Sequence, residues 1–149
     1  MKSHTSYLGD GKWENVDLHV YKPEGDGALF KDITRQTLFK GDGDLSTEIR
    51  YFEMKAGGYS TLERHQHVHK VLIGRGAGHC LVDDQVYEVK QFDFIEIPPM
   101  TWHQFRATTP EPLGFFCMVK CDRDRPLLPT EEDLKQLRAT PAIATFIRI

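Results

Sequence analysis

Apolar and polar positions along the chain favour short β-strands separated by turns. Stretches rich in β-branched or aromatic residues recur at 49–54, 68–73, 80–82, 86–89, 92–97 and 113–119. Turn-forming pairs bound most of them, such as Gly57-Gly58, Asp83-Asp84 and Pro98-Pro99. Many short strands at regular spacing are typical of an antiparallel sandwich or barrel. The pattern therefore predicts an all-β fold.

One stretch is typical of a helix, at about residues 130–138. Thr130 can cap its N-terminus, acidic residues fill its first turn, and Lys135 and Arg138 lie near its end. We expect it to stop before Thr140-Pro141 and to pack outside the barrel or against a partner subunit. Residues 1–45 carry scattered apolar pairs, which predict an N-terminal arm with one or two edge strands.

The 149 residues suit a single domain, 1–149, made of the arm, a barrel over 46–120 and a tail over 121–149. Hydrophobic residues make up 40% and charged residues 28% of the chain, as in ordinary globular proteins. The net charge of −3, with both signs interspersed, gives no reason to expect nucleic acid as a partner. The longest apolar run, 115–119, is far shorter than the roughly 20 residues of a membrane span.

The ends of the chain and its cysteines predict a cytoplasmic protein. The stretch 1–6 leads into polar residues, without the apolar centre of a secretory signal. Cys80, Cys117 and Cys121 are too few for a disulfide scaffold, and their odd number leaves a free thiol in the monomer. A reducing compartment fits this usage.

The most informative window is Glu63-Arg64-His65-Gln66-His67-Val68-His69. In an extended chain alternate side chains share a face, so Glu63, His65, His67 and His69 would project together. Such a face contributes little packing, but imidazole and carboxylate are usual ligands of divalent cations. The window therefore predicts a metal site, and the alternative is an exposed polar strand face.

This window resembles the first motif of the cupin superfamily, Gly-x5-His-x-His-x3–4-Glu-x6-Gly, which contains three metal ligands. Gly57-Gly58 opens the motif here, and Gly76 closes it because 76–93 then has the length of a plain β-hairpin. Counting from Gly76, the resemblance implies metal ligands at Glu63, His65 and His69.

A second register of the same motif uses His65 and His67 as its first ligands. It would place Val71 or Leu72 at the carboxylate position, so we prefer the first register. His67 is then a substitute ligand or a pocket residue.

The second cupin motif corresponds to residues 92–103, and His103 falls where the superfamily has its fourth ligand. Phe92 and Met100 replace two customary glycines, which removes glycine's easy access to positive φ. The resemblance spans roughly residues 46–120 and implies a double-stranded β-helix, a jelly-roll-like barrel. Four protein ligands leave one or two positions of an octahedral ion open, as at a catalytic centre.

Further runs resemble a bacterial cupin group that includes methylthioxylulose 5-phosphate methylsulfurylase. They are Arg50–Glu53, Gly57–His65, Trp102–Gln104, Pro112–Phe115 and Asp122–Pro126. Those enzymes are manganese-dependent and use a cysteine on the last strand, which implies Cys117 as a nucleophile. The alternative is that Cys117 is a small core hydrophobe. The ligand types suit Mn, Fe, Ni, Co or Zn, and the resemblance favours Mn.

The resemblance favours an enzyme for a small carbonyl metabolite, phosphorylated and bearing a thioether, with a metal-stabilised enolate. A phosphorylated substrate needs basic groups, and Arg64, Lys70, Arg75 and Arg106 are candidates by sequence proximity. The alternatives are a non-catalytic binding or sensing module, and a metal-dependent dioxygenase, decarboxylase or isomerase on the same scaffold. A small barrel with long arms also predicts a homodimer.

Overall fold

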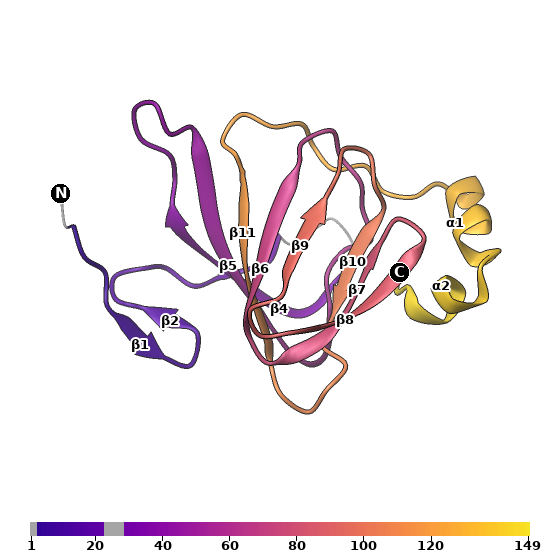
Figure 1. Ribbon diagram of the computed structural model, residues 1–149, viewed down its shortest axis with the longest axis horizontal. Helices are drawn as coiled ribbons and strands as arrows, with labels where there is room; N and C mark the ends of the chain where they lie inside the picture. The colour runs from indigo at the N-terminus through magenta and orange to yellow at the C-terminus, as the bar shows by residue number, and fades with distance from the viewer. Residues whose placement is uncertain (1–2, 23–28) are drawn as a thin grey trace.

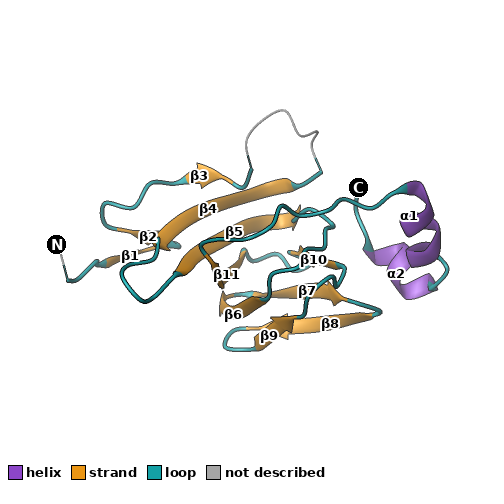
Figure 2. Ribbon diagram, turned by 90° about the horizontal axis from the view of Figure 1, so that it is seen from above, coloured by secondary structure: helices purple, strands orange, loops and turns teal. Residues whose placement is uncertain are grey.

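A curled antiparallel sheet forms the body of the protein, with an N-terminal hairpin at one end and two helices at the other (Figure 1). The computed structural model describes residues 3–22 and 29–149. The view from above shows the hairpin and the helices on opposite sides of the strands (Figure 2). The predicted all-β class is confirmed.

Eleven strands and two helices lie within the described ranges. They are β1 (Tyr7–Gly9), β2 (Lys12–Trp13), β3 (His19–Val20), β4 (Lys31–Phe39), β5 (Thr47–Tyr59), β6 (His69–Arg75), β7 (Ala77–Val82), β8 (Gln85–Lys90), β9 (Phe94–Ile97), β10 (His103–Arg106), β11 (Leu113–Lys120), α1 (Glu131–Arg138) and α2 (Pro141–Phe146). Strands β1 and β2 pair alone, and the main sheet has the order β8-β7-β10-β5-β11-β6-β9, with β4 joining β5 to β3. Each of the six predicted strands overlaps an observed one.

Strand β5 organises the sheet, because it pairs with β4 on one side and with β11 on the other. Met54 lies opposite both Ile33 and Leu113, and all three are buried. Alternation along β5 turns Phe52 and Met54 toward the barrel interior, where they join the main apolar core. This core supports the strands that carry the candidate site.

The N-terminal arm contains more structure than the predicted one or two edge strands. Its described part holds β1 to β4, and β4 is flanked by β3 and β5, so β4 is not an edge strand. Trp13 stacks edge-on against Tyr51 at 4.8 Å and Phe116 at 5.9 Å, which covers the outer face of β5 and β11. The arm therefore completes the sheet and buries Tyr51.

Gly76, Phe92 and Met100 are turn residues with positive φ. Gly76 has a φ of +67°, and a Cβ there would lie 2.1 Å from the carbonyl oxygen of Pro112, so only glycine fits between β6 and β7. Phe92 and Met100 adopt φ values of 72° and 55° although they are not glycine. Their N–H groups donate to the carbonyls of Ile73 and His65, at 2.7 Å each, which holds both turns in place.

Helix α1 begins as predicted, with Thr130 as its cap and a reciprocal capping box to Asp133. The second helix, α2, was not predicted, because Pro141 ends one helix and also begins the next at its first turn. The two helices pack on the outside of their own barrel through a second apolar cluster, made of Leu62, Leu81, Trp102, Leu137, Ile143, Phe146 and Ile147. Among the described residues, no helix has the length and hydropathy of a membrane span.

Candidate active site

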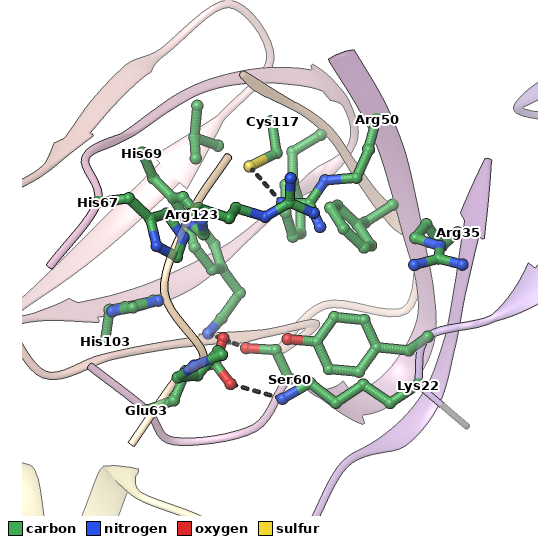
Figure 3. A pocket seen from close by; sticks show the side chains of 16 residues that line it. Lys22, Arg35, Arg50, Ser60, Glu63, His67, His69, His103, Cys117 and Arg123 are labelled. Atoms are coloured by element: carbon green, nitrogen blue, oxygen red, sulfur yellow. Dashed lines mark hydrogen bonds and ion pairs between the residues drawn. The ribbon is translucent and has the colours of Figure 1, made fainter. Parts of the chain in front are cut away.

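A cavity of about 200 Å³ lies inside the curled sheet (Figure 3). Its wall combines imidazoles, guanidinium groups, a thiol and aromatic rings. The lining residues are Tyr21, Lys22, Arg35, Arg50, Phe52, Ser60, Glu63, His67, His69, Val71, His103, Phe105, Phe115, Cys117, Arg123 and Pro126.

The histidine window is not the continuous strand that its pattern predicts. Residues 63 and 64 make isolated β-bridges, the chain bends at 66–67, and β6 begins only at His69. The carboxylate of Asp124 accepts hydrogen bonds from the backbone N–H groups of Gln66 and His67, at 2.8 and 3.0 Å, which fixes the bend. These hydrogen bonds hold the pKa of Asp124 below its usual range. The bend is why His65 and His67 stack, with ring centroids 3.6 Å apart.

Three of the predicted ligands come together. His65, His69 and His103 each offer a nitrogen, and these three atoms lie within 4.8 Å of one another. Backbone bridges in both directions between Glu63 and His103 join the two motifs at this point. The spacing suits three ligands of one metal ion.

The tautomers of two imidazoles are fixed by backbone carbonyls. Nδ1 of His65 lies 2.7 Å from the carbonyl oxygen of His67, and Nδ1 of His103 lies 2.9 Å from that of Thr101. When these Nδ1 atoms carry the proton, each Nε2 keeps a free lone pair. Nε2 of His65 is buried and has no hydrogen-bond partner among the described residues. This orphaned acceptor fits a metal ligand.

His65, His69 and His103 are held in the neutral form that binds metals. Burial and, to a smaller extent, the neighbouring imidazoles of His103 and His67 lower the pKa of His65 to about 4. Burial also lowers the pKa of His69 and of His103. A metal ion therefore meets little competition from protons at neutral pH.

Glu63 and His67, the other candidates in this window, make different contacts. The carboxylate of Glu63 is buried and lies 2.5 Å from Nζ of Lys22, outside the group of three nitrogens (Figure 3). Nδ1 of His67 lies 2.8 Å from the carboxylate of Asp124. His67 lines the cavity, whereas His65 is fully buried beside it.

Cys117 lies on β11 with its side chain in the cavity wall, and it is 2% exposed. Nη2 of Arg50 lies 3.5 Å from its Sγ (Figure 3). Burial raises the pKa of the Cys117 thiol, and the guanidinium of Arg50 opposes this rise. Cys121 does not line the cavity, since its Sγ lies 3.2 Å from the carbonyl oxygen of Lys40.

The four basic residues predicted to receive a phosphate lie outside the cavity, and each has a structural partner. Arg64 lies over the ring of Trp102, Lys70 pairs with Glu96, Arg75 pairs with Glu53, and Arg106 donates to the carbonyl of Phe146. The cations that do line the cavity are Lys22, Arg35, Arg50 and Arg123. Sequence reasoning missed them and Asp124. Arg50, Arg123 and Asp124 lie in runs that carry the family resemblance, and Arg50 also alternates with Phe52 on one strand.

The model for the Cupin domain matches residues 50–119. The chain is 54% identical over 136 residues to 1-methylthio-D-xylulose 5-phosphate methylsulfurylase of Rhodospirillum rubrum, an alignment that covers 91% of this chain and 86% of that protein. A cupin 2 conserved barrel domain protein of Rhodopseudomonas palustris superposes with a TM-score of 0.93 at 51% identity, over 99% of this chain and 100% of that one. A cupin 2 domain-containing protein of Halorhodospira halophila superposes with a TM-score of 0.75 at 38% identity, over 98% and 96% of the two chains. The double-stranded β-helix prediction is thereby confirmed.

Proposed function

Because the chain belongs to the cupin family, we propose that it is a metal-dependent enzyme for a small carbonyl metabolite, with Cys117 as its nucleophile. The observation that carries this proposal is the position of Cys117 in one cavity with two of three clustered imidazoles. The 54% identical relative is named for a methylthio sugar phosphate, which supports that substrate class here.

The metal ligands we propose are Glu63, His65, His69 and His103, with His67 as a substitute. The orphaned Nε2 of His65 supports this assignment, and Glu63 would have to leave Lys22 to join it. The donor set suits Mn²⁺, which we propose, and also Fe, Ni, Co or Zn. When bound, such an ion supplies a Lewis acid for the substrate's carbonyl and for the enolate charge that develops.

Cys117 performs the covalent step as a thiolate, which the nearby guanidinium of Arg50 stabilises. Its sulfur attacks the methylthio sulfur, so that an S–S bond forms and the C–S bond to the sugar breaks. The bonding pair stays on the sugar carbon as an enolate, which then takes a proton. A second thiol attacks the methyl disulfide on Cys117, takes the methylthio group and returns the cysteine thiol.

The resolving thiol comes from solution in this proposal. Cys121 lies four residues beyond Cys117, or roughly 13 Å along an extended chain, and it contacts Lys40 outside the cavity. A small thiol can instead enter through the cavity. The unpaired cysteines also suit a reducing cytoplasm, which we propose as the compartment.

We further propose that residues 1–149 form one cupin unit that dimerises. Both the arm and the C-terminal helices pack on the barrel. On the outer face of β6, β9 and β11, Leu72 and Phe94 are exposed opposite each other, and the exposed Met118 lies in the next row, which supports a contact with a second copy. Sedimentation of the wild type and of Phe94→Glu tests this, and a monomeric wild type would refute it.

The function is tested with protein purified without chelator, a 1-methylthio-pentulose 5-phosphate and a small thiol. We expect about one transition-metal ion per chain and release of the mixed methyl disulfide. Cys117→Ser should keep the metal and lose turnover, while Cys121→Ser, outside the cavity, should retain both. Normal turnover in Cys117→Ser would show that Cys117 is a core residue and not the nucleophile.

A further inference from the structure

Part of the cavity wall is positively charged. Arg35 of β4, Arg50 of β5 and Arg123 beyond β11 all line it. The labelled histidines lie on one side of the view, Arg35 and Arg50 lie on the other, and Cys117 and Arg123 lie between the two groups (Figure 3). Three elements far apart in sequence thus supply one basic wall, which we call the arginine wall.

The charges of this wall are only partly compensated within the protein. Glu48 lies 3.8 Å from Nε of Arg50 and 3.0 Å from Nη1 of Arg123, so the two arginines share one carboxylate. Arg35 forms no ion pair with any described residue. Three guanidinium groups against one carboxylate leave two formal positive charges. The fourth cation, Lys22, is neutralised by Glu63.

The wall also holds hydrogen-bond donors that lack acceptors. The Nε atoms of Arg35 and Arg50 are buried, and neither has a hydrogen-bond partner among the described residues. Buried donors are normally satisfied, so a ligand oxygen is the expected partner. A guanidinium presents its donors in a planar fork that matches phosphate oxygens two at a time.

We infer that Arg35, Arg50 and Arg123 bind the phosphate monoester of the substrate, an assignment that rests on the proposed function. A phosphate dianion would balance the two formal charges and accept from the unpaired donors. Cys117, whose Sγ lies 3.5 Å from Nη2 of Arg50, lies between this phosphate site and the histidines (Figure 3). The substrate would place its carbonyl toward the histidines and its phosphate toward the arginine wall.

The test measures binding of inorganic phosphate to the full-length protein by calorimetry, as purified and after chelator treatment. Arg35→Gln and Arg123→Gln should each weaken binding by about tenfold or more, because each removes a charge-assisted hydrogen bond. Arg138→Gln, an exposed arginine on α1, is the matched control and should bind as the wild type. Arg50 is left intact because it contacts Cys117.

Two results would overturn the assignment. One is wild-type affinity in Arg35→Gln, and the other is loss of phosphate binding on chelation, which would locate the anion at the metal. Thermal unfolding checks that the variants fold, and Arg35→Lys, which keeps the charge, should recover part of the affinity.

Substrate kinetics separate this inference from the proposed function. Arginine-dependent phosphate binding without Cys117-dependent turnover would uphold the phosphate site and refute the reaction. Turnover with an unchanged KM in Arg35→Gln would uphold the reaction and refute the phosphate site. An unphosphorylated 1-methylthio-pentulose should have a KM at least about tenfold above that of the phosphorylated form in the wild type, and this difference should shrink in Arg35→Gln.

Discussion

The two walls of the cavity are built in opposite ways. On the histidine side, burial keeps the imidazoles neutral, and backbone carbonyls fix the Nδ1 atoms of His65 and His103. On the arginine side, Arg50 and Arg123 share one carboxylate, Glu48, and Arg35 forms no ion pair with a described residue. One wall presents lone pairs without charge, and the other presents charge without enough acceptors.

Because of this difference, the two walls bind different kinds of ligand, and their side chains are held in place to different degrees before a ligand binds. Rings locked by main-chain hydrogen bonds keep their geometry whether or not a cation is present. Guanidinium groups present several fixed donors on long side chains, and an anion supplies the acceptors that these donors lack. A substrate with a carbonyl at one end and a phosphate at the other would use both walls, with Cys117 between them.

The largest effect is expected from removing a histidine ligand. His65→Ala or His103→Ala should lower metal affinity by more than the roughly 10–100-fold that loss of an outer partner costs. Elemental analysis after dialysis measures this, with His19→Ala, an exposed histidine on β3, as the control. Full metal occupancy in both cavity variants would show that the histidine wall is not a metal site.

A smaller effect is expected at the bend that shapes the histidine wall. Asp124→Asn leaves one oxygen to accept hydrogen bonds where the carboxylate now accepts from Gln66 and His67 and pairs with the ring of His67. Metal affinity should fall roughly tenfold, as for other outer-sphere partners. Competition with a chromogenic chelator measures it, and Asp122→Asn, an exposed neighbour, should behave as the wild type. Equal affinities would mean that the bend forms without Asp124.

The sequence alone predicted the strands whose two faces differ most in hydrophobicity. In β11, Phe115 and Cys117 turn inward and Met118 turns outward, so alternation placed Cys117 correctly on the buried face. Strand β4 was not predicted at its observed position because its alternation of apolar and polar residues is weak. Its buried positions include Gln36, and threonine and arginine occupy neighbouring positions. Strand signals weaken when polar residues such as Arg35, which lines the cavity, and Gln36, which donates to the carbonyl of Gly11, take the place of core residues.

The metal motif was local enough to be predicted, whereas the arginine wall was not. His65 and His69 are close in sequence, and family resemblance supplied the distant His103. Arg35 and Arg50 lie together only because the register pairs β4 with β5, and Arg50 lies opposite Cys117 only through the pairing of β5 with β11. Strand register depends on the whole sheet, so proximity in sequence pointed to four other basic residues.

A several-fold decrease in the reactivity of the Cys117 thiol is expected when its contact with Arg50 is removed. Arg50→Gln removes the cation that opposes the raised pKa of Cys117, so the pKa of this thiol should rise further. The thiolate fraction at pH 8, and the rate of alkylation by iodoacetamide, should then fall.

The midpoint of the pH profile reports the pKa of Cys117 independently of access to the cavity. Mass spectrometry can follow Cys117 and Cys121 in the same sample, and Cys121 serves as the internal control because it lies outside the cavity. A midpoint that stays in place or moves to lower pH would mean that Arg50 does not stabilise the thiolate.

The smallest expected effect is an increase in phosphate affinity. Glu48→Gln removes the one carboxylate on the arginine wall and raises its formal charge from two to three, so phosphate should bind about two- to threefold more tightly, and more so at low salt. Glu111→Gln changes the net charge equally at an exposed site and controls for long-range attraction. Weaker binding in Glu48→Gln would mean that this carboxylate orients Arg50 and Arg123. Both walls would then be preorganised by fixed partners, and the contrast between them would be one of charge alone.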